Sequence, residues 1–174
     1  MKKKSLAQRI KKIKLLVLDV DGILTDGKIV LDHEGRETKH FDVKDGFGLV
    51  LLKRAGLKTA IISARSSPAL TARAKDLNID KIYQDAFPKI EAYRELLKEF
   101  HLNDDDVCFM GDDLPDREVL LRVGLAATVP SAVTEIKKSV HYVTKKDGGA
   151  GAVREIIELI LKTQGLWKNI LQKY

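Results

Sequence analysis

From residue 58 onward the chain alternates short apolar runs with longer segments that carry apolar residues at helical spacing. This alternation predicts strands followed by helices. It is typical of a mainly parallel sheet with right-handed crossovers, so we predict a Rossmann-like, doubly wound α/β fold. The expected strands cover residues 58–63, 81–83, 107–110, 125–129 and 141–143, and the expected helices cover 68–77, 88–100, 115–123, 131–138 and 151–163.

The first strand of this sheet is the apolar run at residues 15–18, which leads into Asp19-Val20-Asp21-Gly22. If the strand continues to Asp21, both carboxylates point to the same face. If it breaks after Asp19, the second acid or its carbonyl folds over the first. Either geometry concentrates negative charge where open α/β sheets bind ligands, and a hard cation such as Mg²⁺ would neutralise it.

A β-hairpin is expected directly after this acidic segment. Residues 28–31 and 38–43 are β-prone and flank a glycine-containing loop. We predict a flap over residues 27–43 that shades the acidic site, followed by a helix over 47–55. We find no sign of a second folded domain or a separate cap, and we treat residues 1–174 as one domain with a tail at 164–174.

Composition narrows the class of protein. The chain has 174 residues, of which 44% are hydrophobic, which is enough for the core of one domain. No apolar run approaches the roughly 18 residues that span a bilayer, and the basic N-terminus lacks the apolar segment of a signal peptide. We therefore expect a cytoplasmic protein without membrane contact. The single cysteine, Cys108, excludes an internal disulfide.

The net charge of +6 raises the possibility of nucleic-acid binding. However, the basic residues cluster near the N-terminus and then scatter, and only 6% of residues are aromatic. A small anionic substrate explains the excess of positive charge at least as well, through electrostatic steering. We expect no nucleic-acid partner.

Polar groups follow four of the predicted strands. In a parallel sheet all carboxyl ends meet at one edge, so these groups should converge on one crevice. Each has an ordinary structural explanation when taken alone, as a helix cap, a surface lysine or a solvated turn. Their joint placement favours a site. The residues are Asp19, Asp21, Ser63, Arg65, Lys89, Asp112, Asp113 and Asp116.

These residue types suit the cleavage of a phosphate monoester. Such a group carries close to two negative charges, which a carboxylate-bound metal can partly cancel. A lysine and a hydroxyl can hold the remaining phosphoryl oxygens. One carboxylate can serve as nucleophile and give an aspartyl-phosphate, and a second can protonate the leaving oxygen and then activate water.

The combination of Asp-Val-Asp-Gly, Ser63, Pro88-Lys89 and Gly-Asp-Asp-Leu-Pro-Asp at residues 111–116 resembles the haloacid dehalogenase superfamily of phosphohydrolases. The resemblance implies that Asp19 is the nucleophile and a Mg²⁺ ligand. It implies that Asp21 is the general acid/base and binds the metal through its carbonyl. Ser63 and Lys89 would hold the phosphoryl group, and Asp112 would complete the metal site. Asp113 and Asp116 match the acidic motif and would orient ligands or metal-bound water.

Longer segments at residues 19–27, 41–48 and 148–155 are similar to the 3-deoxy-D-manno-octulosonate 8-phosphate phosphatases, small capless enzymes of lipopolysaccharide sugar synthesis. The resemblance implies a homotetramer in which the C-terminal tail lies near a neighbouring site. It also implies contacts to the sugar phosphate from the residues listed next. They are Asp21, Asp42, Val43, Lys44, Asp45, Gly46, Arg65, Arg73 and Lys89.

Two alternatives stay open. A phosphatase for a nine-carbon keto-deoxy sugar acid 9-phosphate would carry nearly the same motifs. A phospho-accepting receiver domain also uses a strand-end aspartate, a hydroxyl and a lysine, but Asp21 is placed to discharge a phospho-aspartate rather than preserve it. The chain also has Ala64 where the family usually has glycine, which leaves the shape of that loop open.

Overall fold

The computed structural model describes residues 4–174, and its centre is a six-stranded sheet in the order β5-β4-β1-β6-β7-β8. Every neighbouring pair in this sheet is parallel, as the alternation predicts. The strands are β1 (Leu15–Leu18), β4 (Lys58–Ile62), β5 (Lys81–Tyr83), β6 (Val107–Met110), β7 (Leu125–Thr128) and β8 (Tyr142–Val143).

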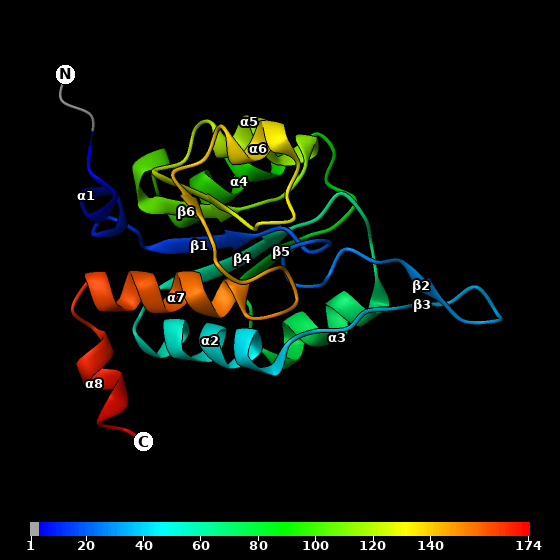
Figure 1. Cartoon of the computed structure of the whole chain (residues 1–174), viewed down its shortest axis with the longest axis horizontal. Helices are drawn as coiled ribbons and strands as arrows, with labels where there is room; N and C mark the ends of the chain where they lie inside the picture. Colours follow the sequence, from blue (N-terminus) through cyan, green and yellow to red (C-terminus); the bar gives the residue numbers. More distant parts are fainter. Residues whose placement is uncertain (1–3) are drawn as a thin grey trace.

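Helices cover both faces of the sheet. On one face lie α2 (Val43–Arg54), α3 (Pro68–Asp76) and α7 (Ala152–Thr163), and on the other lie α4 (Lys89–Phe100), α5 (Arg117–Leu120) and α6 (Thr134–Lys137) (Figure 1). The four residues of β1 are fully buried between these layers, which is why the strand reads as an unbroken apolar run. The doubly wound fold class is confirmed.

The strand order places the acidic segments next to each other. β1 lies between β4 and β6. The chain adds β4 and β5 on one side of β1 and then returns to add β6, β7 and β8 on the other side, so the strand order reverses between β1 and β6. Leu18 pairs with Met110 across these strands, and Asp19 and Gly111 follow directly. The crevice outside such a reversal point is where doubly wound sheets bind ligands.

The hairpin exists but is shorter than predicted. Its strands are β2 (Val30–Leu31) and β3 (Glu37–Thr38), which pair only with each other and project from one end of the molecule (Figure 1). The expected return strand over residues 38–43 is wrong at its end, because Asp42 caps α2. The Asp42 carboxylate accepts hydrogen bonds from the backbone of Lys44 and Asp45, so the helix begins at Val43 rather than Phe47.

Two other helices also differ from the predicted bounds. The helix expected over residues 115–123 is a 3₁₀ turn, η2 (Leu114–Asp116), followed by α5, and the helix expected from Ser131 starts at Thr134. The backbone N–H of Ser131 is instead bonded to the Asp147 carboxylate, which holds this segment in a loop. A further 3₁₀ turn, η1 (Asp104–Asp106), precedes β6.

Both ends of the described chain lie at the end of the molecule opposite the hairpin (Figure 1). α1 (Leu6–Ile10) buries Ile10, and Lys4, Lys12 and Lys14 pair with Asp105 or Asp106. Residues 1–3 of the basic N-terminus lie outside the described part.

The C-terminal helix α8 (Trp167–Leu171) packs against its own domain. Ile170 is 6% exposed, and Leu166 and Trp167 pack against the core, whereas Leu171 and Tyr174 are exposed. None of the helices in residues 4–174 has the length and apolar character needed to cross a lipid bilayer.

Candidate active site

A cavity of about 270 Å³ opens at the carboxyl end of the main sheet, next to the hairpin. Strand ends and the loops that follow them supply its walls. The lining residues are Asp19, Asp21, Gly27, Ser63, Ala64, Arg65, Lys89, Asp112, Asp113, Pro115 and Asp116. The structure therefore brings together every polar residue that the strand-end argument selected.

Lys89 bridges two carboxylates at the floor of this cavity. Its Nζ atom lies 2.7 Å from Oδ1 of Asp19 and 2.6 Å from Oδ1 of Asp116, and all three side chains are buried. Burial by itself lowers the pKa of Lys89, but the two carboxylates outweigh it and hold that pKa above its ordinary value. Lys89 is therefore a permanent positive charge in the site.

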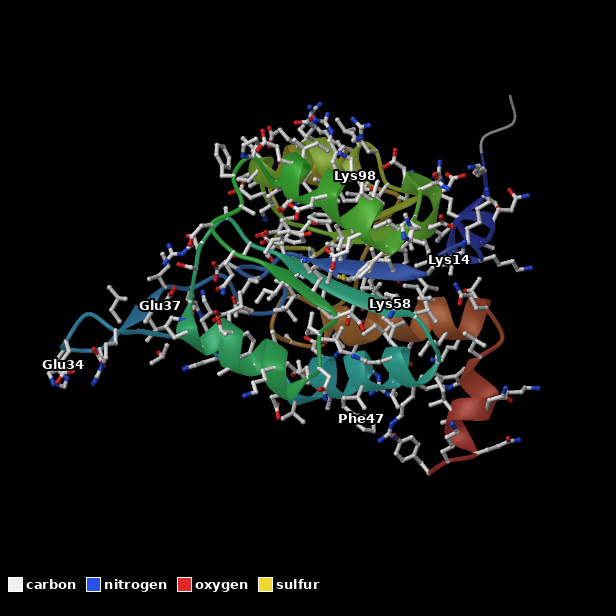
Figure 2. The ribbon with its side chains drawn as sticks, turned by 180° about the vertical axis from the view of Figure 1, so that it is seen from behind. Lys14, Glu34, Glu37, Phe47, Lys58 and Lys98 are labelled. Atoms are coloured by element: carbon white, nitrogen blue, oxygen red, sulfur yellow. The ribbon has the colours of Figure 1, made fainter. Side chains whose placement is uncertain are left out.

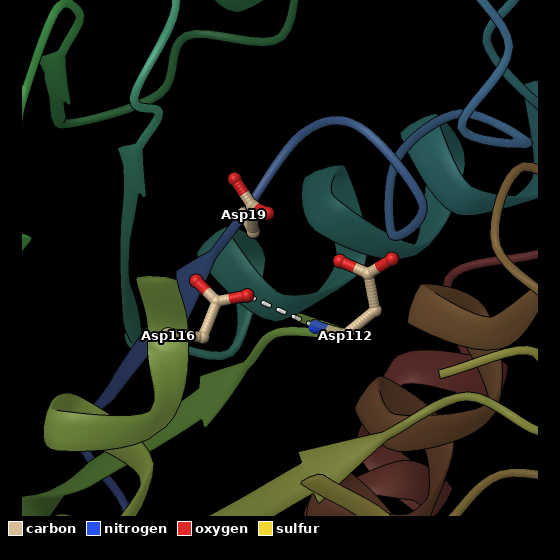
Figure 3. Close-up of side chains that lie close together, drawn as sticks. All are labelled: Asp19, Asp112 and Asp116. Carbon is tan, nitrogen blue, oxygen red and sulfur yellow. Dashed lines mark hydrogen bonds between the residues drawn. The ribbon is translucent and has the colours of Figure 1, made fainter. Parts of the chain in front are cut away.

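Asp116 also organises the loop that carries the next acid. Its second oxygen, Oδ2, accepts a hydrogen bond from the backbone N–H of Asp112 (Figure 3) and another from the backbone N–H of Asp113. Both oxygens of Asp116 are thus occupied by donors of this chain. Asp116 is suited to orienting Lys89 and the Asp112 loop, and its expected role in orienting ligands or metal-bound water stays a prediction.

Asp112 faces Asp19 across the cavity (Figure 3). One oxygen each from Asp19, Asp112 and Asp116 lie within 4.8 Å of one another. The Asp112 carboxylate packs against Gly22, where a Cβ atom would lie only 2.0 Å from Oδ2. Gly22 also has a φ of +86°, a conformation that side chains disfavour, so glycine lets the two acidic loops approach.

The electrostatics of this cluster favour a divalent cation. Asp19, Asp112 and Asp116 supply three negative charges against the one positive charge of Lys89, which leaves two negative charges when all are ionised. Burial, followed by the neighbouring carboxylates, raises the pKa of Asp112 to about 6 and raises that of Asp19 as well. Carboxylate oxygens are the ligands that Mg²⁺ prefers, and Asp19 and Asp112 are the acids with oxygens free to bind it.

The strand breaks before Asp21, as in the second of the two geometries left open by the sequence. β1 ends at Leu18, and the chain turns at Val20, whose carbonyl accepts hydrogen bonds from Ile23 and Leu24. The Asp21 side chain lies at the cavity wall, 29% exposed, with Oδ1 at 2.5 Å from Nζ of Lys39. The carboxylate is therefore close to Asp19 in the chain but held by a residue of the hairpin.

Ser63 and Arg65 line the opposite wall. Ser63 is 3% exposed, and its hydroxyl accepts a hydrogen bond from the backbone of Arg65, which holds the loop in place. Ala64 also lines the cavity and is absent from the residues with positive φ, so a Cβ atom is compatible with this loop. Alanine at position 64 therefore leaves the loop without backbone strain.

The segment expected to contact the sugar lies elsewhere. Asp42, Asp45, Gly46 and Arg73 surround a small second cavity beside α2 and α3, and Val43 is exposed. Asp45 is 1% exposed, and its carboxylate accepts hydrogen bonds from the backbone of Gly151 and Arg154. Of the expected sugar-contacting residues, only Asp21, Arg65 and Lys89 line the 270 Å³ cavity, and contacts from the others stay a prediction.

Comparisons with known proteins agree with this geometry. Residues 57–157 match the model of the haloacid dehalogenase-like hydrolases. The 3-deoxy-D-manno-octulosonate 8-phosphate phosphatase of Yersinia pestis is 41% identical over 157 residues, which cover 90% of this chain and 84% of that protein. The chain belongs to this phosphatase family.

Solved structures of the family superpose closely on the fold. The phosphatase from Moraxella catarrhalis, crystallised with magnesium ion, phosphate ion and KDO, is 42% identical with a TM-score of 0.94, over 96% of both chains. A cobalt-bound deoxy-D-mannose-octulosonate 8-phosphate phosphatase from Haemophilus influenzae is 34% identical with a TM-score of 0.87, over 90% of this chain and 92% of that one.

The glycine-rich segment that resembles this phosphatase family supports the acidic loop. Gly148 packs so tightly against the carbonyl of Gly22 that a Cβ atom would lie 1.8 Å from it, and Gly149 donates to the carbonyl of Ile23. The segment is held from the other side by Asp45, through Gly151. Residues 148–151 thus connect α2 to the loop that carries Asp21.

Two residues at the site were missed from the sequence. Lys39 and Glu37 lie where the hairpin returns to the body of the protein, and Figure 2 shows Glu37 at this base and Glu34 at the exposed tip. Glu37 and Lys39 alternate with Thr38 and His40, so they share one face of the return strand. That alternation is the only local sequence signal for these two residues, and it does not reveal that their side chains contact Asp21 and Arg65.

A larger hollow of about 1010 Å³ lies at the opposite edge of the sheet. Its walls include Lys12, Lys14, Asp105 and Asp106, which pair with one another. These lysines are already neutralised, so this hollow lacks the arrangement that the chemistry of a phosphate ester requires.

Proposed function

We propose that the protein is a Mg²⁺-dependent phosphatase that hydrolyses 3-deoxy-D-manno-octulosonate 8-phosphate to the free sugar acid and phosphate. The observation that carries this proposal is the placement of Asp19 opposite Asp112, with Lys89 between Asp19 and Asp116. The bound magnesium, phosphate and KDO of the Moraxella catarrhalis relative support the metal and the substrate.

Asp19 is the proposed nucleophile. A carboxylate oxygen of Asp19 attacks phosphorus, and the bond between phosphorus and the ester oxygen breaks, which leaves an aspartyl-phosphate. Lys89 and Ser63 hold phosphoryl oxygens at the floor of the cavity, where burial strengthens their interactions. A Mg²⁺ ion held by Asp19, Asp112 and the carbonyl of Asp21 would offset the charge of the phosphoryl group.

Asp21 is the proposed proton donor and acceptor. It protonates the departing sugar oxygen in the first step. In the second step it takes a proton from water, whose oxygen attacks the phosphorus of the aspartyl-phosphate and releases Asp19 and phosphate. Asp21 lines the same cavity as Asp19, which supports this assignment.

The proposed setting is the cytoplasm, in the synthesis of a lipopolysaccharide precursor, with the protein as a homotetramer. α8 lies at the end of the molecule opposite the hairpin (Figure 1), and none of its residues lines the cavity, so the tail is suited to a neighbour's site rather than its own. Contacts from Asp42 to Gly46 and from Arg73 to the sugar belong to the same proposal.

A turnover assay with two substrates tests this function. The eight-carbon sugar acid 8-phosphate and the nine-carbon 9-phosphate are compared at equal concentration, with Mg²⁺ and then with a chelator. We expect faster phosphate release from the eight-carbon substrate and loss of release on chelation. Preference for the nine-carbon ester would transfer the proposal to that substrate, and a stable phosphoprotein without turnover would favour a receiver domain.

A further inference from the structure

A lysine buries its side chain at the base of the hairpin. Lys39 lies one residue beyond β3, and its side chain is only 2% exposed. A buried ammonium group is costly unless it is paired. Nζ of Lys39 lies 2.5 Å from Oδ1 of Asp21 and 3.2 Å from Oε1 of Glu37. The lysine is thus held between an acid of the site and an acid of the hairpin itself.

Lys39 contacts Asp21 from outside the cavity. Asp21 and Arg65 belong to the cavity wall, whereas Lys39 does not. Lys39 occupies Oδ1 of Asp21, and Oδ2 is the oxygen that lies toward Arg65, at 3.8 Å from its Nε. Within residues 4–174, Lys39 is the side chain that hydrogen-bonds the Asp21 carboxylate. The contact leaves Oδ2 as the oxygen for substrate and water.

Glu37 extends this contact to the other wall. Its Oε1 accepts from Lys39 and also from Nη2 of Arg65, at 3.1 Å. Asp21, Glu37, Lys39 and Arg65 therefore form a chain of alternating charges, which we call the hairpin-base cluster. It joins the loop after β1, the return strand of the hairpin and the loop after β4. Since β2 and β3 pair only with each other, this cluster connects the hairpin to the site.

We propose that Lys39 is a positioning residue for the general acid/base Asp21, so that the base of the hairpin sets the geometry of proton transfer. This inference rests on the proposed phosphatase chemistry. A proton donor must lie within hydrogen-bonding distance of the leaving oxygen, and a misplacement of about 1 Å can cost about 10²-fold in rate. Lys39 does not line the cavity, and its contact with the site is the hydrogen bond to Asp21.

The dependence on the leaving group separates a loss of proton transfer from a loss of phosphoryl binding. An alkyl phosphate such as the sugar 8-phosphate needs protonation of its leaving oxygen, whereas p-nitrophenyl phosphate releases a stable phenolate without it. The quantity to compare is kcat/KM, which reports the formation of the aspartyl-phosphate and excludes its hydrolysis. For Lys39→Met we expect about a 10²-fold loss of kcat/KM on the sugar phosphate and little change on p-nitrophenyl phosphate.

Lys28→Met is the matched control, because Lys28 is an exposed hairpin lysine whose partner is Asp26. It should leave kcat/KM unchanged on both substrates. Lys39→Arg keeps a cation at the same place and should recover part of the loss on the sugar phosphate. The melting temperature of each variant shows whether the fold is retained.

Equal losses on both substrates with an unchanged melting temperature would overturn the proposal, as would an unaffected Lys39→Met enzyme. If Lys39→Met unfolds, the comparison is made with Glu37→Gln instead. We expect the same selective loss of kcat/KM on the sugar phosphate, and its absence would contradict the proposal. If the wild-type enzyme hydrolyses p-nitrophenyl phosphate but not the sugar 8-phosphate, the proposed substrate fails. The Lys39 comparison is then made with a primary sugar phosphate that the enzyme does hydrolyse.

Discussion

Nζ of Lys89 lies 2.7 Å from Oδ1 of Asp19, and the two side chains are 2% and 12% exposed. In this position the lysine favours the ionised form of Asp19, the proposed nucleophile. It is also close enough to hold a phosphoryl oxygen. The relationship arises because Asp19 ends β1 and Lys89 begins α4, and both ends meet at the same edge of the sheet.

Replacing Asp19 by asparagine should reduce turnover to the background rate. The amide is not a nucleophile toward phosphorus, and it removes one of the two acids expected to bind the metal. Phosphate release from p-nitrophenyl phosphate measures the effect. The variant should retain its fold, because Lys89 keeps Asp116 as a partner. Appreciable turnover by Asp19→Asn would mean that another group attacks phosphorus.

Replacing Asp21 by asparagine should separate the two chemical steps. Formation of the aspartyl-phosphate from p-nitrophenyl phosphate needs no proton donor, but its hydrolysis needs a base. We expect a burst of p-nitrophenolate followed by steady turnover that is slower by about 10²–10⁴-fold. Rapid-mixing kinetics with p-nitrophenyl phosphate measure both phases. A steady rate equal to that of the wild-type enzyme would exclude Asp21 as the base.

Replacing Asp116 by asparagine should weaken metal binding without removing a ligand. An amide has one acceptor oxygen, so its NH₂ group must face either Lys89 or the N–H groups of Asp112 and Asp113. We expect the apparent affinity for Mg²⁺ to fall by about 10–100-fold. Mg²⁺ titrations of activity measure this change. The exposed Glu118→Gln variant on α5 is the control, and an equal effect there would contradict the orienting role of Asp116.

The stabilisation of the fold by Mg²⁺ should increase with pH. Burial and neighbouring acids raise the pKa of Asp112 to about 6 and raise that of Asp19. Because these folded-state pKa values lie above the unfolded ones, the folded protein binds more protons between about pH 4 and 6, and the metal-free protein loses stability as the pH rises through this range. Mg²⁺ binds the ionised acids and offsets that loss.

Melting curves with and without Mg²⁺ measure this effect. The increase in melting temperature should be several degrees larger at pH 7.5 than at pH 5. An Asp112→Asn variant should lose most of the increase at both pH values. A stabilisation by Mg²⁺ that is equal at pH 5 and pH 7.5 in the wild-type protein would contradict the assignment of these acids as ligands.

Replacing Asp45 by alanine should destabilise the protein. Its carboxylate caps α7 through the backbone N–H groups of Gly151 and Arg154, and its loss leaves these part-buried donors without a partner. We expect a decrease of about 1–3 kcal/mol in the free energy of unfolding, measured by urea denaturation. If Asp45 also contacts the sugar, KM should rise in the conservative variant Asp45→Asn. An unchanged KM would assign Asp45 to the support of residues 148–151 alone.

Local patterns in the sequence determined the sheet and the floor of the site. The apolar run of β1, its acidic end and the alternation of strands and helices are properties of neighbouring residues. The parallel arrangement then requires that the strand ends meet, so Asp19, Lys89 and Asp112 could be placed together without coordinates. A continuous apolar run or a helical spacing of apolar residues is visible within a few neighbouring residues, so these elements can be recognised from the sequence.

Tertiary structure alone decided how these residues are supported. The contact of Lys39 with Asp21 joins residues 18 positions apart through a hairpin, and the bond from Arg154 to Asp45 spans 109 positions. Such contacts depend on how loops close over the sheet, which no local periodicity encodes. The early start of α2 has a local cause instead, since the cap by Asp42 overrode the β-propensity of Phe41 and Val43.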